Sequence, residues 1–342
     1  MLTHRNLLAM TMGFFADICP GFCADDVILH AAPLSHGSGL WALPNIAKAA
    51  QNVILESKSF DTEQVLALIQ EYRVTSMFCA PTMVKQIIDS PLVDQYEHRS
   101  LKALCCGGGP MMVTDIRKAI ETFGPVLVQL YGQGESPMTI SCLPQWGHVL
   151  DGSEQQLKRR GSVGIPRTDV EVRIVDQEDR EASVGEVVTR SDVVMKGYWR
   201  NPEATSKALR NGWLHTGDVG RIDEDGYVFL MDRSKDMIIS SGENIYPREV
   251  EEVIARHPAV REVVVVGIPD PQWGEAIKAV VSLREDCSVT ADQLIAFCKG
   301  HIASYKKPKS VDFVDELPKN SYGKLLKREL RAKYWQGTDR TI

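Results

Sequence analysis

The sequence has no long apolar run, no excess of positive charge and no paired cysteine motif. No apolar stretch in its 342 residues approaches the roughly 20 residues that a transmembrane helix needs. A formal net charge of -6 gives no basic footprint for nucleic acid. The eight cysteines include no Cys-x-x-Cys, so they lack metal-binding spacing and indicate reduced thiols in a cytoplasmic protein. Internal repeats and low-complexity tracts are also absent.

The overall balance is that of an ordinary globular protein, with 44% hydrophobic and 25% charged residues. The chain is too long for one core, which predicts two or three domains. Met1 to Asn6, followed by the apolar Leu7 to Ala16, imitates a signal peptide. The same apolar residues also fit one face of a helix, and we favour an internal helix.

Short apolar runs alternate with helical patterns over residues 1–145. Phe60 to Tyr72 has helical spacing, with Asp61 or Thr62 as its cap. Val74 to Ala80 predicts a strand, and Thr82 to Ile88 a helix that begins after a proline. This alternation predicts a mainly parallel sheet with helices on its faces, which binds ligands at the carboxyl ends of its strands.

Candidate ligand-binding residues follow three predicted strands. A strand from Leu101 to Cys106 runs into Gly107, Gly108 and Gly109 before a helix, Met111 to Phe123. Glycines let a ligand approach the backbone closely, although adjacent glycines also occur in plain turns.

Two further strand ends carry polar or aromatic side chains. Val126 to Leu130 leads into a turn from Tyr131 to Pro137, in which Glu135 is either a cation ligand or a solvated side chain. Tyr131 offers a flat face for a base. An earlier strand, which begins near Val27, leads to His36, either a surface turn residue or part of a pocket.

The middle of the chain has the pattern of a small antiparallel sheet or barrel. After a polar, linker-like segment from Gln145 to Arg160, we expect strands at Val170 to Val175, Gly185 to Arg190 and Val193 to Tyr198. Asp218 follows a glycine turn, where it is either a turn-forming residue or an acceptor for the two hydroxyls of a ribose.

The stretch from Gly226 to Pro247 separates two domains. It predicts a strand, a charged turn over residues 232–236, a second strand and a turn at Gly242. We expect domains over 1–232 and 233–342, with the sheet in 1–145, the β-rich part in 161–232 and a hinge near 233–236. The second domain is a compact α+β unit that includes helices over 247–256 and 290–299 and valine-rich strands.

In order and spacing, these motifs resemble those of the adenylate-forming (AMP-binding) superfamily of acyl-CoA synthetases, aryl-CoA ligases and luciferases. The resemblance covers essentially the whole chain. Gly107, Gly108 and Gly109 look like the family's adenine-contacting turn. Tyr131-Gly132-Gln133-Gly134-Glu135 resembles its Tyr-Gly-x-Thr-Glu motif, in which the tyrosine stacks on adenine and the glutamate serves Mg²⁺.

The resemblance implies roles for residues in both domains. Asp218 and Arg233 match the ribose-binding pair, and Lys235 matches the hinge residue about which the small domain rotates. Lys324, after Gly323, matches the catalytic lysine of adenylation. His36 matches the family's histidine beside the acyl pocket. Rotation about Lys235 would bring the Gly242 loop to the site, where CoA enters. Lys306, Lys307 and Lys309 either meet the phosphates of CoA or form a plain basic surface loop.

The implied fold is α/β: a large adenylate-forming domain, with its sheet and β-rich part, and a mobile α+β C-terminal domain. The implied function is an acid–CoA ligase that uses ATP, Mg²⁺ and CoA. It activates a fatty or aryl carboxylic acid as an acyl-adenylate and transfers the acyl group to CoA. Two alternatives stay open: a non-catalytic module that binds AMP or acyl-adenylate, and an adenylation domain that loads a carrier protein. No carrier-like segment follows Lys324, which favours CoA.

Two departures from the family pattern affect these expectations. Gly134 replaces the threonine whose hydroxyl contacts the α-phosphate. The sequence also contains no Ser/Thr/Gly-rich phosphate loop, which in the family lies just upstream of a segment like Met1 to Asn6. We therefore expect a truncated chain, impaired in adenylation, whose exposed strands favour homo-oligomers. His36, Trp41 and the Pro137-Met138 region are expected to contribute to an apolar acyl pocket.

Overall fold

A computed structural model describes the chain except residues 57–59, 234–235, 241, 321–324 and 336–342. Its internal contacts divide the chain into two compact units. The first comprises Met1–Thr216 and Gly220–Leu230, and the second Gly217–Val219 and Met231–Ile342. The hinge near residues 233–236 stays a prediction, and Lys235 lies outside the described residues.

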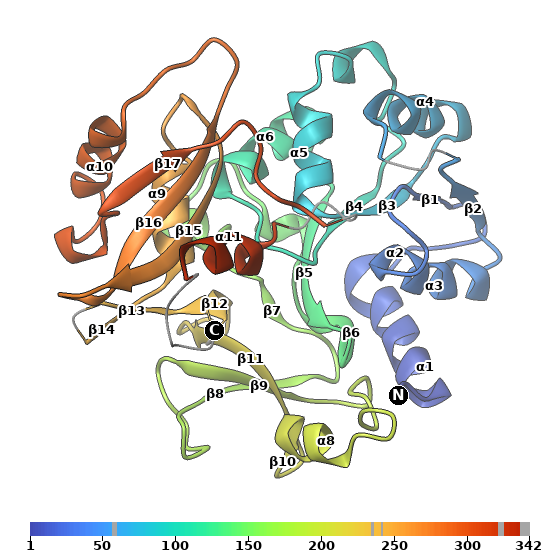
Figure 1. Cartoon of the computed structure of the whole chain (residues 1–342). Helices are drawn as coiled ribbons and strands as arrows, with labels where there is room; N and C mark the ends of the chain where they lie inside the picture. The colour runs from blue at the N-terminus through green and yellow to red at the C-terminus, as the bar shows by residue number, and fades with distance from the viewer. Residues whose placement is uncertain (57–59, 234–235, 241, 321–324, 336–342) are drawn as a thin grey trace. The chain divides into compact units, whose positions relative to one another are not determined.

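The first unit is built on a mixed sheet of seven strands in the described part of the chain (Figure 1). Its strands follow the order β2, β1, β3, β4, β5, β6, β7. The first five strands run parallel to one another. Strand β6 pairs antiparallel with β5, and β7 pairs antiparallel with β6. Their bounds are β1 Val27–His30, β2 Gln51–Ile54, β3 Ser76–Cys79, β4 Ala103–Cys106, β5 Leu127–Gln133, β6 Ser136–Leu143 and β7 Ile165–Pro166.

Helices cover both faces of this sheet (Figure 1). One face carries α4 Thr62–Tyr72, α5 Pro81–Asp89 and α6 Val113–Phe123. The other carries α1 His4–Gly13, a π-helical turn Phe14–Ile18, α2 Gly37–Leu40 and α3 Ala42–Ala47. Every residue of β1, β3 and β4 is buried, as the predicted parallel sheet requires.

A side-chain cap and a first-turn proline begin helices α4 and α5, as the sequence predicted. The Asp61 carboxylate accepts a hydrogen bond from the backbone N–H of Gln64 at 3.1 Å and caps α4. Pro81 occupies the first turn of α5, where its missing N–H costs nothing. The N-terminal segment is helical as we favoured, although Leu8 is exposed because the buried face runs through Met10, Thr11 and Phe14.

The β-rich part of the chain contains five strands in its described residues, ordered β10, β11, β9, β8 with β12 paired to β11. They are β8 Glu171–Val175, β9 Gly185–Arg190, β10 Leu209–Arg210, β11 Trp213–Ile222 and β12 Val228–Arg233, with α8 Pro202–Ala208 between β9 and β10.

Three predictions for residues 131–198 were wrong. Residues 193–198 form turns and bends rather than a strand, because Gly197 adopts a φ of +141°. The linker-like segment contains a short 3-10 turn (Gln145–Gly147) and a helix, α7 Glu154–Arg159, which Ser153 caps through a reciprocal hydrogen-bond box. The turn predicted from Tyr131 to Pro137 shrinks to Gly134 and Glu135, because β5 and β6 form a hairpin.

The second unit is an α+β unit whose sheet (Figure 1) has a buried apolar cluster on each of its faces. Its strands are β13 Ile238–Ser240, β14 Glu243–Ile245, β15 Val260–Asp270, β16 Gly274–Leu283 and β17 Ser310–Phe313, and its helices are α9 Pro247–Ile254, α10 Ala291–Lys299 and α11 Lys327–Tyr334. Val263 and Val265 of β15 pack with α9 and α10, whereas Val264 and Val266 pack with Leu330 of α11. This alternation explains the valine-rich strand.

The predicted α/β architecture is therefore confirmed, with a parallel-sheet body, a β-rich part and a smaller α+β unit. Among the residues that the structure describes, no helix is long and apolar enough to cross a membrane.

The buried His148 predicts a pH-dependent stability. Its ring nitrogens lie 3.0 Å from the Pro144 carbonyl oxygen and 3.0 Å from the Gln129 side-chain amide. Burial lowers the pKa of His148 from 6.5 to about 4. The unfolded chain therefore binds more protons between these values, and up to about 3 kcal/mol of stability is lost as the pH falls through this window.

We expect the thermal midpoint of wild type to fall more steeply between pH 7 and pH 4.5 than that of His148→Gln. The exposed His4→Gln serves as the control and should follow wild type. Parallel profiles for wild type and His148→Gln would contradict the assignment.

Candidate functional site

The carboxyl ends of the central parallel strands lead into the residues that the sequence singled out. Because β1, β3, β4 and β5 run in one direction, the loops that follow them leave from the same edge of the sheet. The loop after β1 holds His36, the one after β4 holds Gly107 to Gly109, and the one after β5 holds Glu135. The fold therefore places these predicted residues at one edge.

His36 and the glycine turn lie side by side. Gly108 has a φ of +84°, and a Cβ on it would stand 3.9 Å from His36 Cε1. A Cβ on Gly109 would stand 3.9 Å from the ring of Pro81, the first residue of α5. Gly107 donates its N–H to the Cys79 carbonyl at 3.3 Å. Loops from β1, β3 and β4 thus meet at two exposed glycines, which leave the backbone open to a ligand.

The motif from Tyr131 to Glu135 is part of the β5–β6 hairpin. Tyr131 is 7% exposed and packs with Ile140, Val187 and Val228. Gln133 donates its side-chain N–H to the Thr216 carbonyl at 2.8 Å, which ties the end of β5 to β11. Adenine stacking by Tyr131, and nucleotide contacts by Gly132 and Gln133, remain predictions.

Glu135 occupies the hairpin turn and is half-buried. Its Oε1 accepts a hydrogen bond from the Tyr198 hydroxyl at 2.5 Å, and its carbonyl accepts one from Met195 N–H at 2.7 Å. The hydrogen bond to Glu135 is the largest cause that raises the pKa of Tyr198 to about 12. Sequence reasoning missed Tyr198, because it lies 63 residues away in a segment assigned to a strand.

The donor set around Glu135 suits Mg²⁺ that arrives with a nucleotide. In the described ranges, no group of three or more His, Cys, Asp or Glu side chains is placed to hold a metal. Mg²⁺ in such sites is bound by one or two carboxylates, with phosphates and water supplying the other ligands. A single half-buried carboxylate at the strand edge fits this pattern.

Asp218 and Arg233 come together in the second unit. Asp218 lies on β11 and is 7% exposed, whereas Arg233 ends β12 and is exposed. Arg233 Nε lies 3.3 Å from Asp218 Oδ1. A carboxylate that accepts and a guanidinium that donates form a suitable pair for ribose hydroxyls. Asp218 was expected just after a glycine turn, but it lies within a long strand that Gly217 continues at a φ of +71°.

A cluster of charged side chains that the sequence did not indicate lies nearby in the same unit. Lys327 Nζ lies 2.9 Å from Glu251 Oε1 and 3.4 Å from Asp232 Oδ2. The Glu251 side chain is 3% exposed and also accepts the Val265 N–H at 2.8 Å. Lysines on a polar helix are usually solvated, so helical spacing gave no signal for Lys327. The cluster joins the start of α11 to α9 and to the end of β12.

The CoA-side residues are partly described. Gly242 forms the β13–β14 turn at a φ of +80° and is exposed. Lys306 Nζ lies 2.8 and 2.7 Å from the two carboxylate oxygens of Glu249, and Lys307 is half-buried. Lys324 lies outside the described residues.

The expected acyl-pocket residues differ in their surroundings. Trp41 is buried and packs against Phe14 and Phe78, with ring centroids 5.0 and 6.5 Å apart. Pro137 is buried on β6, and the Met138 side chain lies outside the described residues.

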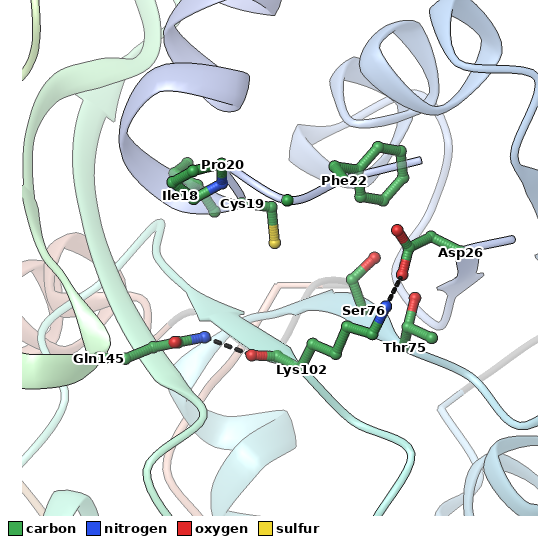
Figure 2. Close-up of a pocket in the computed structure, with 10 residues that line it drawn as sticks. Ile18, Cys19, Pro20, Phe22, Asp26, Thr75, Ser76, Lys102 and Gln145 are labelled. Atoms are coloured by element: carbon green, nitrogen blue, oxygen red, sulfur yellow. Dashed lines mark hydrogen bonds and ion pairs between the residues drawn. The ribbon is translucent and has the colours of Figure 1, made fainter. Parts of the chain in front are cut away.

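A separate cavity of about 330 Å³ lies at the opposite, amino-terminal edge of the parallel strands (Figure 2). Figure 2 shows Lys102 reaching Asp26, and the two side chains lie 2.7 Å apart. Ile18, Cys19 and Phe22 form its apolar side. Because it opens at the other end of the strands, we do not include it in the candidate site.

The fold and this edge define a class: an α/β protein of the adenylate-forming type, with a small α+β unit after the sheet domain. The model of the AMP-binding enzyme family matches residues 1–199, and that of the AMP-binding enzyme C-terminal domain matches residues 249–324. The chain belongs to the AMP-binding enzyme family.

Relatives of known name are similar over nearly the whole chain. A feruloyl-CoA synthase from an Amycolatopsis species is 39% identical over 339 residues, which cover 98% of this chain and 66% of that protein. The medium/long-chain-fatty-acid–CoA ligase FadD8 of Mycobacterium tuberculosis is 36% identical over 330 residues, with coverages of 93% and 56%.

A solved structure has the same fold. The amide bond synthetase McbA from Marinactinospora thermotolerans superposes with a TM-score of 0.90 and 34% identity, covering 97% of this chain and 67% of that one. The chain thus spans between 56% and 67% of the lengths of these three proteins.

The Asp218–Arg233 pair predicts a loss of AMP affinity in Asp218→Asn. A hydrogen bond to a charged group contributes about 1.5–3 kcal/mol, so we expect AMP to bind roughly 10- to 100-fold more weakly. Isothermal titration with AMP measures this. Asp192→Asn, which removes the exposed partner of Arg5, is the matched control and should bind like wild type. Unchanged affinity in Asp218→Asn would exclude a ribose contact.

Proposed function

We propose that this chain carries the acyl-adenylate and CoA chemistry of an acid–CoA ligase. In the complete reaction, a carboxylate oxygen attacks the α-phosphorus of ATP, and the bond to pyrophosphate breaks. The thiol sulfur of CoA then attacks the acyl carbon, AMP leaves with the bonding electrons, and the thiol proton is released. The observation that carries the proposal is the meeting of His36 and the exposed glycine turn at the strand edge where Glu135 also lies.

The chain's residues have distinct tasks in this proposal. His36 lines the acyl pocket, and Glu135 holds the Mg²⁺ that neutralises phosphate charge when the nucleotide is bound. Asp218 and Arg233 hold the ribose. The nucleotide-contacting residues are Gly107, Gly108, Gly109, Tyr131, Gly132 and Gln133. The residues toward CoA are Gly242, Lys306 and Lys307.

Lys324 is the proposed catalytic lysine of adenylation. Its ammonium group offsets the repulsion between the acid's carboxylate and the α-phosphate, and it stabilises the charge that shifts between them. Lys235 is the proposed pivot that removes Lys324 from the site before CoA attacks. Both roles are carried over from the family motifs.

The two half-reactions need different parts of the protein. A glycine-rich phosphate loop cradles the β- and γ-phosphates, which depart as pyrophosphate, and the 342 residues contain no such loop. Thioester formation needs only the acyl-adenylate and CoA sites. We therefore propose that the chain is impaired in adenylation and competent in acyl transfer.

The substrate is proposed to be an apolar acid of the aryl or fatty type. Relatives named for ferulic acid and for medium- and long-chain fatty acids support this class. All eight cysteines are free thiols, which supports a reducing compartment such as the cytoplasm.

The test follows acyl-CoA by mass spectrometry in two parallel reactions. One contains ATP, Mg²⁺, CoA and ferulic, octanoic or palmitic acid, and the other contains the pre-made acyl-adenylates with CoA. We expect at least about 100-fold more thioester from the adenylates, because losing about 3 kcal/mol of phosphate stabilisation costs two orders of magnitude. Equal yields would refute impaired adenylation, and no thioester from either would favour a binding module.

Lys324→Ala separates the half-reactions within the site. We expect its acyl transfer from a pre-made adenylate to stay within about twofold of wild type, because the lysine acts only on the bond to the α-phosphate. Any adenylation measured by ATP–pyrophosphate exchange should be lost. Lys333→Ala on α11 is the control. A parallel loss in acyl transfer would remove Lys324 from its assigned role.

A further inference from the structure

Tyr198 contacts the carboxylate to which the proposed function assigns Mg²⁺. The 2.5 Å distance from its hydroxyl to Glu135 Oε1 falls in the range of charge-assisted O–H···O⁻ bonds, about 2.5–2.7 Å. Both residues belong to the first unit. The contact joins the β5–β6 turn to the irregular segment that follows β9.

The segment that carries Tyr198 is itself fixed. The backbone N–H of Tyr198 donates a hydrogen bond to Thr205 Oγ1 at 2.9 Å. The Thr205 hydroxyl in turn donates to the Asn201 carbonyl at 2.8 Å. A Cβ on Gly197 would stand 2.7 Å from Thr205 Cγ2, so only glycine allows this close approach to α8. The phenol therefore projects from a backbone with defined partners.

Glu135 has a fixed backbone but a long side chain. Its carbonyl accepts the Met195 N–H at 2.7 Å, so the segment that holds Tyr198 also holds the turn. Three torsions separate the Glu135 backbone from its carboxylate, and ordering them costs conformational entropy. A hydrogen bond from Tyr198 selects one carboxylate position before any ligand binds.

A carboxylate held in one position is suited to binding Mg²⁺. This ion demands near-octahedral geometry, and a hydrogen-bonded partner that orients a metal ligand typically contributes 10- to 100-fold in metal affinity. A carboxylate has about four lone-pair sites, so the bond from Tyr198 leaves room for a cation. We propose that Tyr198 is a positioning residue that orients Glu135 toward the Mg²⁺ accompanying ATP; this inference rests on the proposed function.

The test uses Tyr198→Phe, which removes one oxygen and keeps the ring. Mn²⁺ serves as the probe, and water-proton relaxation reports the ternary complex of chain, ATP and Mn²⁺. We expect the variant to bind Mn²⁺–ATP about 10-fold more weakly than wild type. Its affinity for AMP without metal should stay within about twofold, because Tyr198 acts through Glu135.

Two further variants sharpen the result. Tyr96→Phe is the matched control, since Tyr96 also donates to a glutamate, Glu63, at 3.3 Å but on an exposed surface. Glu135→Gln should weaken Mn²⁺–ATP at least as much as Tyr198→Phe does. Adding Tyr198→Phe to Glu135→Gln should cost nothing more, because the hydroxyl would have no carboxylate left to position.

Each contrary outcome has a different meaning. Wild-type Mn²⁺–ATP affinity in Tyr198→Phe would overturn the inference, and so would an equal loss of metal-free AMP binding, which indicates a merely structural role. A wild-type chain that binds AMP but forms no Mn²⁺–ATP complex would also overturn this inference, because Tyr198 would then prepare no metal site in this chain. A wild-type chain that fails to bind AMP would overturn the proposed function itself.

Discussion

The candidate site in the first unit depends on the common direction of β1, β3, β4 and β5. Parallel pairing forces every loop that follows these strands to leave from one edge, so residues far apart in the sequence become neighbours. His36 and Gly108 are 72 positions apart by number, yet a single methyl group on the glycine would touch the histidine ring. Strand direction and burial therefore determine where the site lies, and the side chains in the loops determine what it can bind.

In the second unit, buried charge has a comparable role. Glu251 is almost fully buried and needs a cation, which Lys327 supplies, and Lys327 also lies near Asp232. Leaving one member of such a buried cluster unpaired is costly. Because Asp232 immediately precedes Arg233, the cluster fixes the end of the strand that presents Arg233 to Asp218. One charge pair thus supports the geometry of another.

Burial and capping made much of the fold predictable. Continuous apolar runs gave β1, β3 and β4, and the side-chain caps Asp61 and Thr290 gave α4 and α10. The failures have physical causes as well. Residues 193–198 alternate like a strand, but Gly197 turns the chain toward Thr205. In α11, Leu330 is buried in the core and Tyr334 packs against it, and the many charges around them hide the helical face. Long-range partners such as Tyr198 leave no local pattern at all.

The β5–β6 hairpin links these observations, because it belongs to two structures at once. Its main-chain bonds join the parallel strands to the antiparallel end of the mixed sheet, while Tyr131 and Ile140 pack against Val187 and Val228 of the β-rich part. Gln133 and Glu135 add polar ties to that part through Thr216 and Tyr198. The turn that holds Glu135 is therefore positioned from both sides. A change in the β-rich part can then move the carboxylate, because the segment that carries Met195 and Tyr198 holds the turn through both its backbone and its side chain.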